Sequence, residues 1–377
     1  VKYDKISEEL RFFRKWFLIA FLIGIVSGVA AVTFHYAIEI SLEYFLEEIS
    51  GYVPPRPGPT PRVVLPKTPS LIIVSTVLGG ILSGILVFKF APEAEGHGTD
   101  AIIDAFHYKE GRVRPRVPFI KLIASAITIG SGGSAGKEGP VAQIGGGVGS
   151  LLAEKLKLST KDKRIALAIG MGSGIGAIFK APFGGAIFAS EVLYLMDFEP
   201  EVLPPAFVAS LVGYLIVGTF TGWKPIFWSP SLVGEEQTLN EPFTLLMFTL
   251  LGILNGIIGV IYIKTFYGVR KLFNKIQGIP NEVKPAIGAL VTGVIGMFFP
   301  QVLESSYGWL QMAINGDFTH LPLTVLLVLP FLKILATSFS IGSGGSGGVF
   351  APSLVIGGSI GALIWHIAKI VEPQYPI

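Results

Sequence analysis

The 377-residue sequence contains no cysteine, and only 15% of its residues are charged. Without cysteine the chain can form no disulfide bond, iron-sulfur cluster or thiolate metal site. The formal net charge of +3 comes from basic residues that lie between apolar runs, and it gives no sign of nucleic-acid binding. We therefore expect no metal, no other cofactor and no nucleic-acid partner, and we read the basic residues as markers of membrane topology.

Hydrophobic residues, by contrast, are abundant. They make up 51% of the chain, and the mean hydropathy is +0.64, whereas ordinary soluble domains reach about 45–50% apolar residues with glycine included. This composition predicts a membrane protein, and we expect it to be all-helical, multi-pass and located in the cell membrane. The first apolar run, residues 16–40, is much longer than the core of a signal peptide and precedes no cleavage site, so we expect a retained spanning helix.

The most informative feature is a glycine-rich break that occurs twice. Residues 130–140 read GSGGSAGKEGP, and 212 positions later residues 342–352 read GSGGSGGVFAP. The likeness continues upstream, where IKLIA (120–124) matches LKILA (332–336). Each break is expected between apolar segments of about 12–15 residues. Interrupted hydrophobic segments at matching positions in two halves indicate the substrate site of a repeat-built transporter.

The distribution of charge predicts how the chain crosses the membrane. The basic segment before residue 16 places the N-terminus in the cytoplasm. Basic loops near residues 109–116 and 155–164 are assigned to the same side, and the proline-rich stretch 54–69 to the outside. The remaining predicted apolar segments are 71–90, 165–178, 182–196, 206–220, 243–263 and 286–299. An acidic loop with Glu235, Glu236 and Glu241 is predicted outside.

Three full crossings separate the two breaks, so the repeats are predicted to be inverted. We expect a single transmembrane transport domain over residues 1–377, with a first repeat at about 16–221 and a second at about 243–377. The counterpart of the segment 165–192 would fall at about 377–404, so the second repeat is expected to be truncated, and no soluble regulatory domain is expected. Chance similarity of two glycine-rich helix-packing segments is the alternative.

Each break is followed at once by a predicted helix start, Gly139-Pro140 in one copy and Ala351-Pro352 in the other. Free amide groups and the positive ends of both helices then point at the middle of the membrane, which favours an anion. Glu138 is the acidic side chain in this element, and it is predicted to act as a gate that occupies the anion site and leaves when protonated. The alternative is a glutamate that merely complements the helix dipole. Lys137 is expected to raise the local positive potential.

Two other classes of site were considered. A nucleotide P-loop would need glycine in place of Ser131, Ser or Thr in place of Glu138, and a preceding buried strand. An intramembrane serine protease would need a base beside its nucleophile. The candidate nucleophiles are Ser131, Ser134, Ser343 and Ser346, and the five histidines show no spacing that singles out a base: His35, His97, His107, His320 and His366.

At these residues the chain resembles the CLC family of chloride channels and proton-coupled chloride exchangers. GKEGP (136–140) is similar to the family's G-[KR]-E-G-P element, GVFAP (348–352) to its G-x-F-x-P element, and GHGTD (96–100) stands where G-S-G-I-P is usual. The resemblance implies an inverted-repeat fold of short, broken and tilted helices, and a homodimer in the lipid bilayer with one pathway per subunit. It makes Glu138 the gate and implies the anion-binding residues His97, Gly98, Lys137, Gly139, Val349, Phe350 and Ala351.

Three departures from the family pattern bear on function. His97 replaces the serine that usually contacts the central anion, Asp100 replaces a proline, and Val192 stands at the exchangers' proton-relay glutamate. Glu191, one residue earlier and about 100° around the helix, is the candidate relay. The family's anion-contacting tyrosine would lie beyond Ile377. For His97, an interfacial histidine or a helix cap is the alternative role.

We therefore predict a non-enzymatic protein that transports chloride or a similar small anion, in a channel-like or weakly proton-coupled manner. A proton-coupled chloride antiporter is the near alternative, and an intramembrane serine protease the distant one.

Overall fold

The computed structural model describes residues 2–194, 198–228 and 242–371, with side chains from residue 14 onward. Within these residues every regular element is helical, and β-structure is limited to three isolated bridges, Val53 with Val64, Gly96 with Ser346, and Gly136 with Gly348. The predicted all-helical class is confirmed. Of the acidic loop, Glu235, Glu236 and Glu241 lie outside the described residues.

The first half of the chain supplies eight helices: α1 (Lys2–Leu42), α2 (Leu71–Phe90), α3 (Thr99–Tyr108), α4 (Arg116–Gly130), α5 (Glu138–Lys155), α6 (Thr160–Phe179), α7 (Pro182–Glu191) and α8 (Leu203–Thr221). The described part of the second half supplies α9 (Pro242–Lys275), α10 (Lys284–Phe298), α11 (Tyr307–Ile314), α12 (Leu323–Gly342) and α13 (Phe350–Val371). A π-helical turn, Glu43–Ser50, continues α1, and short 3-10 turns at Pro92–Ala94 and Pro300–Val302 follow α2 and α10.

Three of the four helices beside the breaks are longer than the expected 12–15 residues, and α4 falls within that range. α4 has 15 residues, α5 has 18, α12 has 20 and α13 has 22. α12 gains length because it starts directly after Pro322, and the proline inside it, Pro330, does not end it. Six helices of the described chain, α12 and α13 among them, are long and apolar enough to cross a membrane.

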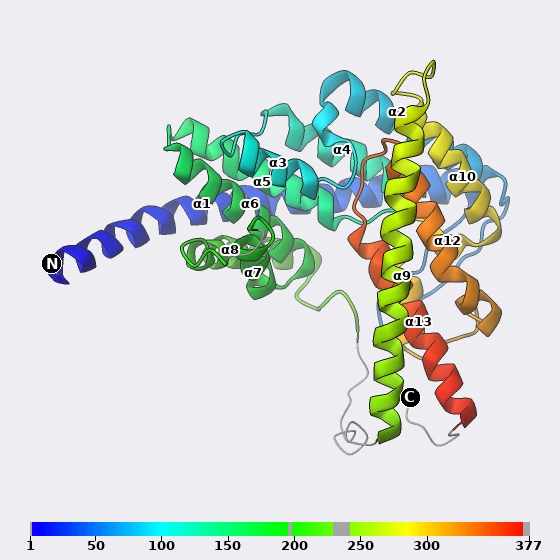
Figure 1. Cartoon of the computed structure of the whole chain (residues 1–377). Coiled ribbons are helices and arrows are strands. Elements are labelled where there is room, and N and C mark those ends of the chain that lie inside the picture. Colours follow the sequence, from blue (N-terminus) through cyan, green and yellow to red (C-terminus); the bar gives the residue numbers. More distant parts are fainter. Residues whose placement is uncertain (1, 195–197, 229–241, 372–377) are drawn as a thin grey trace.

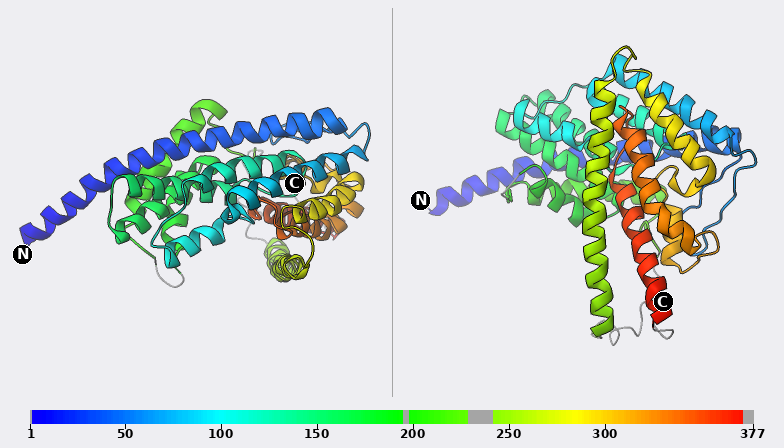
Figure 2. Two further views of the ribbon diagram at one scale, coloured as in Figure 1. Left: turned by 90° about the horizontal axis from the view of Figure 1, so that it is seen from above. Right: turned by 45° about the vertical axis from the view of Figure 1, so that its right-hand side comes forward.

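α9 is also longer than the predicted span 243–263, with 34 residues. It continues through Lys264, Arg270 and Lys271 because charged residues with long side chains are good helix formers once the chain has left the apolar layer. The helix projects from the body in Figure 1, and Figure 2 shows α13 running beside it. Most of its apolar side chains face outward, as lipid-facing side chains of a membrane protein do.

The helices of the first half pack closely because glycines, which have no side chain, lie where the helices contact each other. A Cβ on Gly145 would lie 2.2 Å from the carbonyl oxygen of Gly170, and one on Gly149 would lie 2.0 Å from that of Ala166. α5 and α6 therefore touch backbone to backbone, as membrane helices with small residues at their interface do. α1 crosses the same group and packs on α8, α6 and α4 (Figure 2, left view). This packing holds the start of α5 in the interior.

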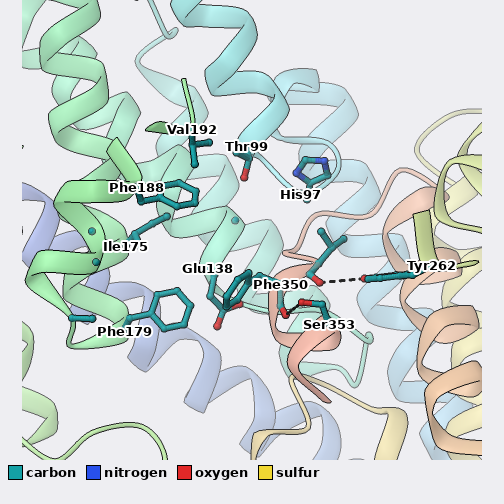
Figure 3. A pocket seen from close by; sticks show the side chains of 15 residues that line it. His97, Thr99, Glu138, Ile175, Phe179, Phe188, Val192, Tyr262, Phe350 and Ser353 are labelled. Carbon is teal, nitrogen blue, oxygen red and sulfur yellow. Dashed lines mark hydrogen bonds between the residues drawn. The ribbon is translucent and has the colours of Figure 1, made fainter. Parts of the chain in front are cut away.

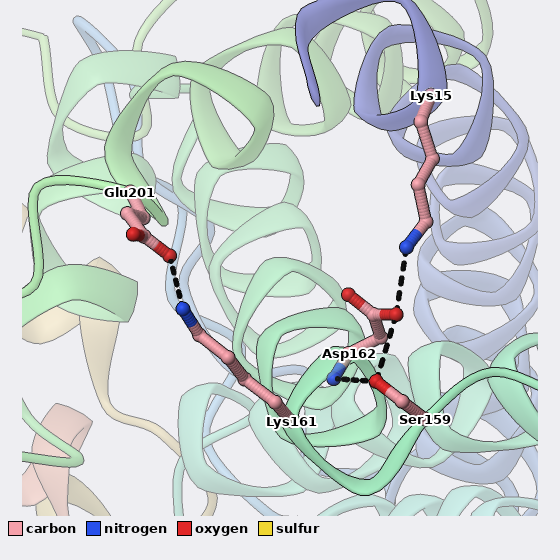
Figure 4. Close-up of polar contacts among 5 residues, drawn as sticks. All are labelled: Lys15, Ser159, Lys161, Asp162 and Glu201. Carbon is pink, nitrogen blue, oxygen red and sulfur yellow. Dashed lines mark hydrogen bonds and ion pairs between the residues drawn. The ribbon is translucent and has the colours of Figure 1, made fainter. Parts of the chain in front are cut away.

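At one end of this group, charged side chains join the ends of three helices (Figure 4). Lys15 of α1 contacts Asp162 in the first turn of α6 at 2.6 Å, and Lys161 contacts Glu201 just before α8 at 2.9 Å. The hydroxyl of Ser159 accepts a hydrogen bond from the Asp162 amide and so caps α6. The beginning of α1 and the basic loop before α6 therefore lie at the same end of the molecule.

The two halves repeat one another in detail. α4 and α12 end, and α5 and α13 begin, 212 positions apart, whereas the ends of α2 and α10 and the starts of α3 and α11 are 208 positions apart. Gly136 and Gly348 exchange two backbone hydrogen bonds, both 2.7 Å long. A reciprocal antiparallel bridge between equivalent residues relates the two breaks by a local two-fold axis, as expected of an inverted repeat. The inversion of the two halves across the membrane stays a prediction.

Candidate functional site

The candidate site is built where the two breaks meet. Gly132 and Gly344 begin the equivalent turns with φ of +98° and +104°, a left-handed conformation that favours glycine. A Cβ on Gly348 would lie 2.8 Å from the carbonyl oxygen of Gly136 and 3.0 Å from the amide of Gly139. Because glycines leave both segments without side chains here, the starts of α5 and α13 approach each other closely. The free backbone amides of the two helix starts therefore lie near one another.

The loop before α3 is the third component. Gly96 donates to the carbonyl of Gly345 at 2.9 Å and accepts from the amide of Gly347 at 3.2 Å. The ammonium of Lys121, which is fully buried, donates to the carbonyls of Ala94 at 3.0 Å and Gly96 at 2.6 Å. These bonds fix the loop against the second break and hold the next residue, His97, beside the start of α5.

His97 is paired rather than free. Its Nε2 lies 3.0 Å from Oδ2 of Asp100, and the guanidinium of Arg270 on α9 lies 3.6 Å from the same oxygen. The hydrogen bond from His97, followed by the charges of His97 and Arg270, lowers the pKa of Asp100 against the effect of partial burial. Asp100, at the position where the CLC pattern has proline, therefore stays ionised and orients the imidazole.

A cavity of about 670 Å³ opens at this junction, and we call it the α7 cavity. Its lining includes the following residues from α3, α5, α7, α9, α13 and the loops between them: His97, Thr99, Glu138, Gly139, Phe188, Val192, Tyr262, Val349 and Phe350. Figure 3 shows Phe350 beside Glu138, with Val192 and Thr99 at the opposite end of the cavity. The Tyr262 hydroxyl donates to the Val349 carbonyl at 3.2 Å.

Glu138 is 3% exposed although it is ionisable. The hydroxyl of Tyr307 donates to its Oε1. Its Oε2 has no hydrogen-bond partner of good geometry among the described residues, although the backbone amide of Ala351 lies nearby. The carboxylate therefore occupies the point at which the amides of the two helix starts converge.

A second cavity, of about 540 Å³, is lined by Tyr307, the partner of Glu138, but not by Glu138 itself, and we call it the proline-loop cavity. Its lining comes from α1, the loop after it, the first break and the start of α11, and includes His35, Glu39, Pro55, Arg56, Lys137, Glu304 and Tyr307. Glu138 lines the α7 cavity and Tyr307 lines the proline-loop cavity, and the two side chains contact each other between the cavities.

The predicted site residues fall into four groups. His97, Glu138, Gly139, Val349 and Phe350 share the α7 cavity, Lys137 lines the proline-loop cavity, and Gly98 and Ala351 are buried behind them. Glu191 is exposed and outside the cavity that Val192 lines. The functional roles of all these predicted site residues stay predictions.

Sequence reasoning missed Tyr262 and Tyr307. No sequence motif marks Tyr307, because the 208-residue spacing of Thr99 and Tyr307 appears only in the helix starts of the structure.

Comparisons with known proteins agree with this architecture. A model of the family described as voltage gated chloride channel matches residues 79–377. An uncharacterized protein of Methanocaldococcus jannaschii, MJ0305, is 32% identical over 361 residues, which are 96% of this chain and 82% of that relative. The H(+)/Cl(-) exchange transporter ClcA of Salmonella newport is 28% identical over 324 residues, and these span 81% of this chain but only 64% of the exchanger.

Solved structures show the same fold. A slow cyanobacterial Cl-/H+ antiporter superposes with a TM-score of 0.80 at 23% identity, over 95% of this chain and 81% of that one. A CLC-type fluoride/proton antiporter superposes with a TM-score of 0.76 at 19% identity, over 95% and 82% of the two chains. The chain is thus an integral, multi-pass membrane protein, and it belongs to the CLC family, the voltage gated chloride channel family.

Proposed function

We propose that this protein transports chloride or a similar small anion across a membrane, along a path that joins the α7 cavity to the proline-loop cavity. The observation that carries the proposal is the position of Glu138, a buried carboxylate at the start of α5 that separates the two cavities. A carboxylate at this point imitates a bound anion, since the amides and positive ends of α5 and α13 favour negative charge there.

Glu138 is proposed as the gate. While its carboxylate fills the site, an anion cannot occupy it, and protonation removes the charge that competes with the anion. Gly139 and Ala351 would supply amides to the outer anion position, and Val349 and Phe350 to a central one beside His97. Lys137, in the proline-loop cavity, raises the positive potential on the approach to the gate.

The orientation and assembly are part of the proposal. From the basic loops we infer that the α7 cavity faces the cytoplasm, with the N-terminus, and that the proline-loop cavity faces outside. Residues 1–377 would act as a single transport domain of two inverted repeats, about 16–221 and 243–377, in a homodimer within the lipid bilayer.

The mode of transport has two candidates. Channel-like or weakly proton-coupled transport is favoured by Val192, because this apolar residue faces the α7 cavity while Glu191 is exposed outside it. A proton-coupled antiporter is favoured equally by the relatives, since ClcA is described as an H(+)/Cl(-) exchange transporter. A proton path needs titratable groups or ordered water between the cytoplasm and Glu138.

The hydrogen bonds made by the hydroxyls of the four candidate nucleophiles argue against a serine protease. In the described residues Ser131 and Ser343 donate to backbone carbonyls one turn earlier, Ser134 bonds Thr337, and Ser346 bonds Ser125 and the Ala94 carbonyl. A nucleophile needs a base in hydrogen-bond reach, and these hydroxyls are engaged elsewhere.

Chloride-loaded liposomes test the proposal. Dissipation of a chloride gradient without proton movement supports the channel-like mode, and uphill proton movement driven by that gradient supports the antiporter. The absence of any anion flux from correctly folded protein would refute both.

A further inference from the structure

The loop that carries His97 has a counterpart in the second half that no sequence motif marks. α3 and α11 start 208 positions apart, so residues 96–99 correspond to residues 304–307. The backbones agree: φ is +73° at Gly96 and +94° at Gly98, and it is +49° at Glu304 and +60° at Ser306. Two non-glycine residues thus hold a left-handed conformation that costs energy, which requires support from their surroundings.

That support comes from a second buried lysine. Lys333, the equivalent of Lys121, donates to the carbonyls of Val302 at 3.0 Å and Glu304 at 2.9 Å, and to the Ser306 hydroxyl at 2.7 Å. The Glu304 carboxylate accepts a further bond from the Ser306 amide at 2.5 Å. Lys333 and Ser306 are fully buried and Glu304 is 7% exposed. The loop is therefore rigidly tied, and it fixes the first residue of α11.

That first residue is Tyr307, which is 4% exposed. The edge-to-face contact with Phe227, at a centroid distance of 5.1 Å, holds its ring. The next residue, Gly308, lies so close to the proline loop that a Cβ would be 1.7 Å from the carbonyl oxygen of Pro55. With both its ring and its backbone held, Tyr307 presents its hydroxyl to Oε1 of Glu138.

We propose that Tyr307 is a positioning residue that latches Glu138 in its blocking position, so that the loop 304–307 forms a barrier on the proline-loop side of the pathway. The inference rests on the proposed gating role of Glu138. A phenol donates a stronger hydrogen bond to a carboxylate than to a neutral carboxylic acid. The latch therefore holds the gate while Glu138 is charged and weakens when a proton arrives.

The variant Tyr307→Phe tests the latch, because it removes one oxygen atom and keeps the ring. Chloride efflux from liposomes is measured against outside pH. Loss of a charge-assisted hydrogen bond should change the population of the latched gate by about ten- to a hundredfold, which moves the pH of half-maximal flux upward by about 1–2 units. Chloride affinity in detergent at neutral pH should rise as well, since the anion competes with a less firmly held carboxylate.

The matched control is Tyr214→Phe. The ring of Tyr214 is also held by an edge-to-face contact, with Trp223 at a centroid distance of 5.6 Å, but Tyr214 lines neither cavity. This variant should behave as wild type. The other titratable or charged groups around Glu138 are unchanged in both variants: Lys137, Glu304, His35 and Lys180 toward the proline-loop cavity, and His97 toward the α7 cavity.

Glu138→Gln separates failure of the latch from failure of the proposed function. If Glu138→Gln removes the pH response while Tyr307→Phe titrates and binds chloride like wild type, the latch is refuted and the gate survives. If Glu138→Gln changes nothing, the gate itself is refuted. Should Tyr307→Phe fold poorly, Tyr307→Leu, which also lacks the hydroxyl, must shift chloride affinity in the same direction for the proposal to stand.

Discussion

Replacing Glu138 by glutamine is the most direct perturbation of the proposed pathway. The side chain keeps its size and can still accept a hydrogen bond from Tyr307, but it loses its charge. A hydrogen bond to a charged group contributes about 1.5–3 kcal/mol, and one between neutral groups about 0.5–1.5 kcal/mol. The difference of about 1–1.5 kcal/mol corresponds to roughly a tenfold change in the population of the closed gate.

We therefore expect Glu138→Gln to raise chloride flux at neutral pH by about tenfold and to abolish its dependence on outside pH. The assay is chloride efflux from liposomes at neutral and acidic outside pH. Glu201→Gln is the control, because Glu201 contacts Lys161 at 2.9 Å and lines neither cavity. Unchanged flux and an unchanged pH response in Glu138→Gln would reduce Glu138 to a residue that complements the helix dipole.

Three further predictions concern the rest of the pathway. His97→Ser should change anion affinity while transport continues, because the imidazole lines the α7 cavity with Val349 and Phe350; identical binding isotherms of the two proteins would contradict it. Lys333→Met and Lys121→Met should each lower the free energy of unfolding by about 2–3 kcal/mol, because each removes a buried ammonium that donates to two backbone carbonyls; thermal unfolding in detergent measures both, and a negligible shift in either variant would argue against the role of that lysine. Proton coupling should be weak or absent and unaffected by Glu191→Gln, since Glu191 lies outside the α7 cavity; stoichiometric proton movement that this variant abolishes would identify a displaced relay.

The sequence by itself determined the membrane-helical class, the position of both breaks and the location of the candidate site. These features depend on local chemistry. Hydropathy reports which segments avoid water, and glycine and proline mark where the backbone must turn and where a helix can start. The helix starts at Glu138 and Phe350 follow from such signals, and so does the 212-residue repeat.

Only the tertiary structure decided which groups meet across the chain. The 208-residue correspondence between the loops before α3 and α11 has no sequence signature. Lys121 and Lys333 hold these loops by donating to backbone carbonyls, and every residue has a backbone carbonyl. Arg270 reaches Asp100, and Tyr307 reaches Glu138, from distant helices whose packing no local pattern encodes. The division of the site into two cavities, with Glu138 between them, therefore became visible only once the helices were placed.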